Sequence, residues 1–185
     1  MSEPKLAEEQ PFRVGLQLNA TGYRPSVLTP GTHEEWIELG SLSATSNAPV
    51  VRVAASDLRD AGSRADAIRA DAAGQNAPAP AIIIDVEVLV DPDARCALRA
   101  LARPDGQLQQ PSSLRYVGTP RGLAGLLADI RALGIADGVA LLPLTMPGSA
   151  EHILDGLLEQ LTVEGFQVSS DAVDTARLLL VRDVA

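Results

Sequence analysis

The sequence predicts an α/β fold in which a parallel sheet of four or five strands carries packed helices. Residues 116–161 give the strongest indication, because a capped amphipathic helix, a short apolar run and a second helix follow one another with little polar sequence between them. Such an order is typical of one unit of a parallel α/β barrel or open sheet. The 46% hydrophobic content can fill a core, and the length favours one domain at 12–185 behind a flexible tail at 1–11.

The first strand is expected at 14–18, where apolar residues alternate with glycine and glutamine in the period of a strand. The glycines and prolines of 19–31 then predict a long loop. Thr32 and Glu35 have the spacing of a capping box, which predicts a short helix from Thr32 to about residue 45.

The middle of the chain should supply two more strands, each with a helix after it. Three valines within 50–53 predict the second strand, and Asp57 can cap a helix that runs as far as residue 73. Prolines within 74–80 end that helix. The clearest strand is Ile82–Val90, which is β-branched at most positions, and a helix is expected at 91–102.

The last third repeats this alternation. Thr119 can cap a helix, Pro120 suits its first position, and Gly134 supplies its stop. The apolar run 139–144 is too short for a helix and predicts a strand buried on both faces. An amphipathic helix follows, and 177–182 is expected to form a terminal strand, with a helix as the alternative.

Composition argues against several classes of partner. The net charge of −9 opposes nucleic-acid binding, because affinity for phosphates depends on Lys and Arg. With two Phe, two Tyr and one Trp, a platform for stacking bases is not expected. No apolar run reaches the roughly 18 residues of a membrane span, and no signal peptide is evident. Cys96 is the one cysteine, so no intrachain disulfide can form and a cytoplasmic location is expected.

The motifs from Tyr116 onward resemble the C-terminal part of the bacterial luciferase-like, flavin-dependent monooxygenases. The residues that carry the resemblance are YVGTP at 116–120, the Gly134-x-x-Asp137-Gly138 turn, LLP at 141–143 and Pro147-Gly148. FRVGLQL at 12–18 is similar to the first barrel strand of that family, and the helix and strand at 57–90 give a weaker likeness.

The resemblance implies an incomplete (β/α)8-barrel-like domain, because a closed barrel usually needs about 250 residues. It also implies FMN or a deazaflavin as cofactor, and a monooxygenase or other oxidoreductase that acts on a small organic substrate. A non-catalytic binding or assembly module derived from the family is the alternative. Open parallel edges invite another chain, so we expect a homodimer or a subunit that completes the barrel of a related partner.

Ligand-binding candidates are the residues that follow strands, because ligands sit beyond the carboxyl ends of parallel strands. Gln17, Asn19, Ser56 and Thr145 meet this criterion. Gly148 and Ser149 begin the last amphipathic helix, whose free N–H groups could bind a phosphate. The structural alternatives are that Ser149 is an ordinary helix cap and that Asn19 bonds its own backbone.

Candidate catalytic groups are few. His33 lies beside two glutamates, which would favour its protonated form, although a solvated helix start is the preferred interpretation. Asp85 and Glu87 alternate on one strand face, where two carboxylates could act as an acid/base pair or line a polar interior. His152 is expected on a helix surface and Cys96 in a packed helix face. No spacing indicates a metal site, and no GxGxxG or GxxxxGK motif occurs.

Overall fold

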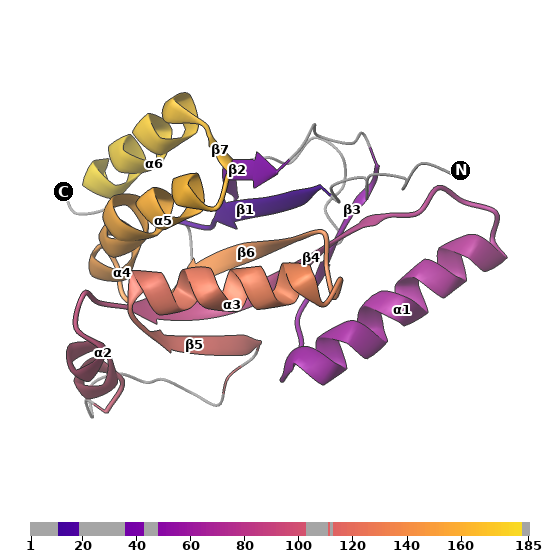
Figure 1. Ribbon diagram of the computed structural model, residues 1–185, viewed down its shortest axis with the longest axis horizontal. Helices are drawn as coiled ribbons and strands as arrows, with labels where there is room; N and C mark the ends of the chain where they lie inside the picture. Colours follow the sequence, from indigo (N-terminus) through magenta and orange to yellow (C-terminus); the bar gives the residue numbers. More distant parts are fainter. Residues whose placement is uncertain (1–10, 19–35, 43–47, 103–110, 112, 183–185) are drawn as a thin grey trace, which may run out of the picture.

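Seven strands form one mixed sheet in the computed structural model, which describes residues 11–18, 36–42, 48–102, 111 and 113–182 (Figure 1). The strands are β1 (Phe12–Leu16), β2 (Ile37–Leu42), β3 (Val50–Val53), β4 (Ala81–Val90), β5 (Leu114–Gly118), β6 (Gly138–Pro143) and β7 (Gln167–Val168). The helices are α1 (Leu58–Gly74), α2 (Ala94–Leu101), α3 (Pro120–Ala132), α4 (Gly148–His152), the π-helical η1 (Ile153–Leu157), α5 (Leu158–Val163) and α6 (Ser170–Arg182).

Five of these strands are mutually parallel, which confirms the predicted parallel sheet. Strand β4 pairs in parallel with β3, β5 and β6, and β6 pairs in parallel with β1. Strands β2 and β7 extend the sheet with antiparallel pairings beyond β1. The α/β class is therefore as predicted, with an antiparallel extension that the sequence did not indicate.

A fork in the sheet lies along one edge of β4. Strand β3 pairs with residues 81–84 of β4, and β5 pairs with residues 86–90. Strand β6 pairs with residues 83–88, so it occupies the opposite edge. Because a strand has only two edges, β3 and β5 share one of them, and Asp85 lies between their two pairings.

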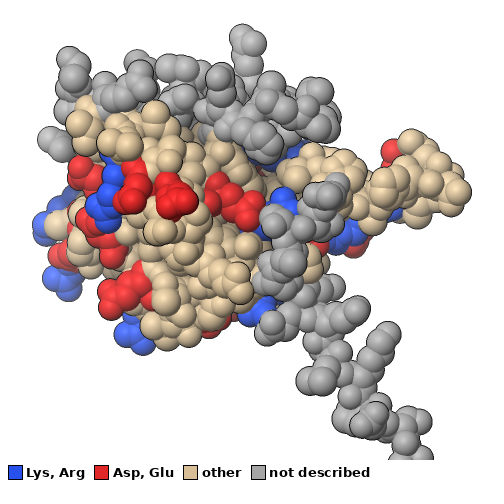
Figure 2. Space-filling model, turned by 90° about the horizontal axis from the view of Figure 1, so that it is seen from above, with Lys and Arg blue, Asp and Glu red and all other residues tan. Residues whose placement is uncertain are grey.

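One face of the sheet carries the main core and the helices. Side chains of α3, η1, α5 and α6 pack there against alternate residues of β1, β4 and β6, and Figure 1 shows α3 lying along β4 and β6. Helix α1 contributes only Ala61 and Ala65 as fully buried residues, and its carboxyl end projects beyond the rest of the described chain (Figures 1 and 2).

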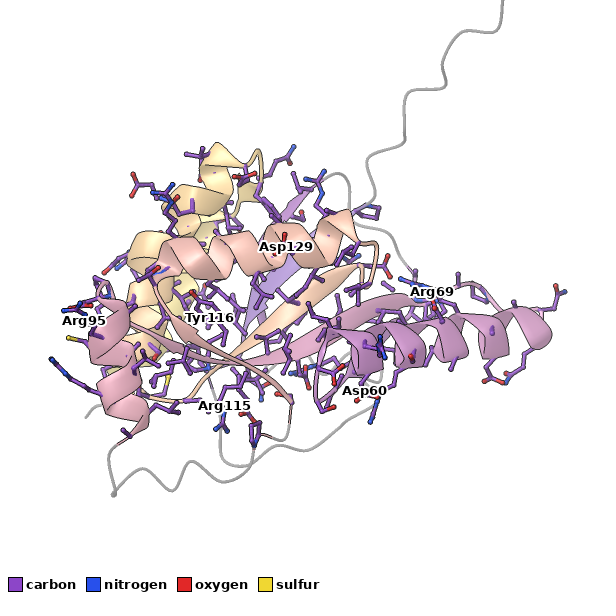
Figure 3. All side chains as sticks on the ribbon, turned by 60° about the horizontal axis from the view of Figure 1, so that its bottom comes forward. Asp60, Arg69, Arg95, Arg115, Tyr116 and Asp129 are labelled. Atoms are coloured by element: carbon purple, nitrogen blue, oxygen red, sulfur yellow. The ribbon has the colours of Figure 1, made fainter. Side chains whose placement is uncertain are left out.

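We call the face of the sheet opposite these helices the polar face. It carries alternate residues of five strands and the residue after β1: Arg13 and Gly15 of β1, Gln17 after it, Arg52 of β3, Ile83, Asp85 and Glu87 of β4, Arg115 of β5, and Gly138, Ala140 and Leu142 of β6. Figure 3 shows the alternation on β5, where Tyr116 lies on the side of α3 and Arg115 on the other side. Parallel strands in α/β proteins usually have both faces covered.

Local helix signals in the sequence are confirmed. Asp57 Oδ1 accepts a hydrogen bond from the Asp60 N–H at 2.8 Å, which caps α1. Thr119 Oγ1 accepts from the Gly122 N–H at 3.2 Å, with Pro120 in the first position of α3. Gly134 ends α3 with a φ of +61°, a conformation that glycine adopts without strain.

Two predicted elements are wrong. Residues 37–42 of the expected helix 32–45 form β2, which pairs antiparallel with β1 and buries Leu39 and Leu42; residues 32–35 lie outside the described chain. The expected strand 177–182 belongs to α6, so the helical alternative is the correct one; Ala176 and Leu180 are buried there while Leu178 is 69% exposed. Burial at i and i+4 is the period of a helix. The predicted tail also lies outside the described residues, except for Pro11.

Candidate functional site

The carboxyl ends of β4 and β6 form a topological switch point. The chain leaves β4 through α2 and enters β5 on one side, whereas it leaves β6 through α4, η1 and α5 toward β7 on the other side. Between two neighbouring parallel strands whose connections diverge, the loops leave a crevice in which α/β proteins bind ligands. A ligand site is therefore expected at this end of the sheet.

Two adjoining cavities lie at this switch point. The smaller has a volume of about 80 Å³ and lies between the end of β4, helix α2 and the loop after β6. The larger is a groove of about 480 Å³ between the start of α3 and the helices α4, η1 and α5. That volume is in the range of small-molecule sites. His152 lines both cavities, so the two are neighbours in space.

Three of the predicted ligand-binding residues meet in the smaller cavity: Thr145, Gly148 and Ser149. The hydroxyls of Thr145 and Ser149 are 2.8 Å apart and hydrogen-bonded. Ser149 Oγ also accepts from the Val90 N–H at 3.1 Å, and the Ser149 N–H donates to the Thr145 carbonyl at 3.1 Å. Ser149 thus ties the end of β4 to α4. Pro147, not Ser149, precedes the helix, and no side chain caps it.

Charged groups of both signs line the larger groove. Arg121 and His152 provide potential cations, and Asp155 and Glu159 provide carboxylates. Asp155 already pairs with Arg177, at 2.7 Å between Oδ1 and Nη2. One carboxylate of the groove is therefore paired within the chain, and the groove also carries the Arg121 guanidinium and the Glu159 carboxylate.

Close packing fixes the two walls of the groove relative to each other. A Cβ added to Gly156 of η1 would lie 2.8 Å from Pro120 Cγ, so the π-helical segment can approach the start of α3 only because this residue is glycine. The Tyr116 hydroxyl donates to the Thr119 carbonyl at 2.9 Å, and burial raises the pKa of this phenol, while its hydrogen bonds to Thr119 oppose the rise. These contacts connect the start of α3 to η1 and to β5.

On the polar face, both predicted carboxylates have arginine partners. Asp85 Oδ1 lies 2.6 Å from Arg52 Nη2, and these side chains are 3% and 7% exposed. Glu87 Oε2 lies 2.6 Å from Arg115 Nη2. Burial raises the pKa of Asp85, and the Arg52 charge opposes that rise. No partner for either carboxylate is evident in the sequence, but each is paired with an arginine of a neighbouring strand.

Next to these ion pairs, the polar face carries a cluster of apolar side chains. The indole of Trp36 lies against Gly15, where an added Cβ would be 2.8 Å from Trp36 Cδ2. Trp36 also packs against a small cluster formed by Ile83, Ala140 and Leu142. Gly15 is thus the residue that lets an aromatic ring lie flat on the sheet.

Gln17 follows β1 directly, at the edge of this apolar cluster. Its N–H donates to the Leu141 carbonyl at 2.9 Å, which continues the pairing of β1 with β6. Within the described chain, its side-chain Oε1 and Ser113 Oγ are the buried side-chain polar atoms without a hydrogen-bond partner. Buried acceptors are seldom left unpaired in folded proteins, so Gln17 Oε1 is unusual among the described side chains.

The remaining candidates are scattered. Ser56 donates its N–H to Asp60 Oδ2 at 3.1 Å, at the exposed start of α1. Asn19 and His33 lie outside the described residues. Cys96 was expected to be packed but is exposed, with its Sγ 3.9 Å from Asp93 Oδ2. His152 was assigned to a helix surface, and its place between two cavities was missed.

Two negative findings apply to the described part of the chain. No group of three or more His, Cys, Asp or Glu side chains is arranged there to hold a metal ion. None of its helices combines the length and hydropathy needed to cross a membrane.

Sequence comparisons identify no relative. No protein-family model matches the chain, and no curated protein matches it.

Solved structures give fold-level matches. A long-chain alkane monooxygenase matches with a TM-score of 0.53 at 15% identity, over 63% of this chain and 37% of that chain. An EDTA monooxygenase from Chelativorans sp. BNC1 matches with a TM-score of 0.52 at 16% identity, over 63% and 40%. A riboflavin lyase solved with modified FMN and riboflavin matches with a TM-score of 0.50 at 17% identity, over 63% and 39%. The chain thus spans about two fifths of these proteins, and its resemblance to the luciferase-like flavin monooxygenases is confirmed as a shared fold with an incomplete barrel.

Proposed function

We propose that this chain binds a flavin at the carboxyl end of its parallel strands and takes part in the flavin-dependent oxidation of a small organic compound. The observation that carries the proposal is the groove at the switch point between β4 and β6, with Arg121 and His152 on its walls. The fold shared with two monooxygenases and with a riboflavin lyase that holds modified FMN supports the choice of ligand.

The groove fits a flavin in two respects. The Arg121 guanidinium can hold a phosphate by charge, and the His152 imidazole can hydrogen-bond to it. The volume of about 480 Å³ is in the range of small-molecule sites.

A reduced flavin, if bound there, would supply the electrons for oxygen chemistry. The part of the chain's own residues is to position the ring and to keep water from it. Trp36 and the buried Ile83 and Leu142 exclude water from the polar face. The pairs Arg52–Asp85 and Arg115–Glu87 fix the strands that support it. Neither carboxylate serves as a free base, since each is held by an arginine.

Titration of purified protein with FMN and with riboflavin, followed by quenching of flavin fluorescence, tests the proposal. We expect saturable binding at micromolar concentration and tighter binding of FMN, because only FMN carries the phosphate. Arg121→Ala should weaken FMN binding about tenfold, the effect of losing one charge-assisted contact, and leave riboflavin binding unchanged. Arg131→Ala, at the far end of the same helix, is the matched control. Binding of a 5-deazaflavin should be measured in the same titration.

A second candidate function is a non-catalytic assembly module, as a homodimer or as a subunit that completes the barrel of a related partner. Strand β5 pairs with β4 alone among the described strands, and an unpaired edge of this kind can add a strand from another chain. Light scattering gives the mass in solution. A dimer that ignores every flavin supports this module over the enzyme, whereas a monomer that binds FMN supports the flavin site.

A further inference from the structure

We propose that a third cavity, at the amino end of the parallel strands, binds a small oxyanion such as inorganic phosphate or a short carboxylate. The cavity has a volume of about 200 Å³ and is lined by residues of β1, of α1, of the segment before β4 and of the turn before β6. It lies at the end of the sheet opposite to the groove of Arg121 and His152. The inference goes beyond the proposed flavin site and does not depend on it.

Two guanidinium groups from different elements line this cavity. Arg13 belongs to β1 and is 8% exposed, whereas the side chain of Arg69, in α1, is 32% exposed and extends toward the sheet (Figure 3). The charge of Arg13 also acts on Glu38 of β2, where burial raises the pKa of the carboxyl and Arg13 opposes the rise. Guanidinium groups match the geometry of phosphate and carboxylate oxygens better than any other side chain.

The carboxylate of the cavity, Asp137, is held in place by the backbone. Its Oδ2 accepts a hydrogen bond from the Ile82 N–H at 2.8 Å and another from Arg69 Nη2 at 3.1 Å. Its own N–H donates to the Ile82 carbonyl at 2.8 Å, and its carbonyl accepts from the Arg13 N–H at 3.0 Å. Among the described residues that line the cavity, this one negative charge faces two positive charges. The lining is therefore positive in a chain whose net charge is −9.

Arg69 has hydrogen-bonding capacity beyond its pair with Asp137. A guanidinium group carries five N–H donors, and within the described chain one of them, on Nη2, is used by Asp137. Nη1 lies 3.9 Å from Asp66 Oδ1, which is too far for a hydrogen bond. An anion in the cavity can therefore bind Arg69 without displacing Asp137.

The size of the cavity limits the ligand. A volume of about 200 Å³ is below the roughly 300 Å³ at which sites for larger organic ligands begin, so a nucleotide or a flavin is too large. An anion held between β1 and α1 would fasten that helix, which buries only Ala61 and Ala65 completely. In barrel folds the amino end of the strands contributes to stability and the carboxyl end to catalysis. We therefore expect this ligand to stabilise the fold.

Thermal unfolding in phosphate, acetate and chloride, at equal ionic strength and pH, tests the proposal. At about ten times its Kd, a bound anion should raise the melting temperature by about 3–6 °C relative to chloride. A shift in phosphate alone identifies a phosphate site, and a shift in acetate as well identifies a site for carboxylates too. Because phosphate also stabilises proteins without binding to them, the comparison with variants is decisive.

Two variants should abolish the shift. Arg69→Met removes the donors, and it should also lower the melting temperature in chloride, because Asp137 loses its partner. Ala79→Glu adds a carboxylate to the cavity lining at an exposed residue and leaves the arginines in place, so it gives an answer even where Arg69→Met does not fold. The matched controls are Arg64→Met, at the exposed pair with Asp60 on the same helix, and Gly125→Glu, where an added Cβ meets nothing within 4 Å. Both controls should keep the shift.

Three results would overturn the inference. The first is a melting temperature that is the same in all three salts. The second is a phosphate shift that persists in Arg69→Met and in Ala79→Glu, which would show general salt stabilisation. The third is a shift that Arg121→Ala abolishes and Arg69→Met retains, which would place the anion in the groove at the other end of the sheet. Flavin titration of Arg69→Met and Ala79→Glu tests the proposed function separately, since neither change lies in that groove.

Discussion

Replacement of Arg52 by methionine should destabilise the fold more than any single change at an exposed ion pair. The variant leaves Asp85, which is 2% exposed, without the guanidinium that now lies 2.6 Å from its Oδ1. Removing one partner of a buried pair typically costs about 3–5 kcal/mol. Since domains are stable by about 5–15 kcal/mol, and 1 kcal/mol shifts the melting temperature of a chain this long by about 2–4 °C, a loss of roughly 6–20 °C is expected.

The loss should depend on pH in a defined direction. Burial raises the pKa of Asp85 above its unfolded value, and Arg52 opposes that rise, so Arg52→Met raises the pKa further. A carboxyl whose folded pKa is raised contributes stability that is present below the unfolded pKa and is lost as pH rises through the folded pKa. The variant should therefore approach wild-type stability in acid and fall increasingly behind it as pH rises toward neutrality.

Urea denaturation followed by circular dichroism, from acid to neutral pH, measures this difference. Arg177→Met removes the partner of Asp155 from an exposed pair and should change little at either pH. The double variant Arg52→Met/Asp85→Leu replaces the pair by apolar groups and should recover most of the loss. A single variant as stable as wild type at neutral pH, or a loss that is the same at every pH, would refute the assignment of Asp85 as a charge held by Arg52.

Two further predictions concern close contacts near the site. Gly15→Ala should displace the Trp36 ring, because the new Cβ would be 2.8 Å from it; we expect a loss of about 1–3 kcal/mol and a changed emission from this single tryptophan, and an unaltered spectrum would contradict the packing. Ser149→Ala should cost about 1–3 kcal/mol in chemical denaturation, because the Val90 N–H loses its acceptor; Thr162→Ala, whose hydroxyl bonds only the Leu158 carbonyl of its own helix, should change stability less.

The accurate parts of the sequence-based prediction rest on local signals. The caps of α1 and α3 depend on residues three positions apart, Asp57 with Asp60 and Thr119 with Gly122, and such pairs are visible in a linear sequence. The convergence of Thr145, Gly148 and Ser149 also follows from a local rule about strand ends.

The errors in the prediction occur where the local structure depends on residues far apart in the sequence. Residues 37–42 become β2 because β1 pairs with them, and this pairing overrides the capping-box signal before them. Arg52 meets Asp85 across 33 residues and Arg115 meets Glu87 across 28. Both contacts depend on β3 and β5 sharing one edge of β4, and no periodicity in the sequence encodes that register.

The fork also explains why the site is a crevice and not the mouth of a barrel. In a barrel each strand follows its predecessor around the ring, and all connections turn the same way. Here α3 carries the chain from β5 past β4 to β6, so the connections after β4 and β6 diverge, as in an open sheet. The opening between them is the place where His152, the start of α3 and the loop after β6 meet. Strand order, more than any motif, therefore determines which residues line this opening.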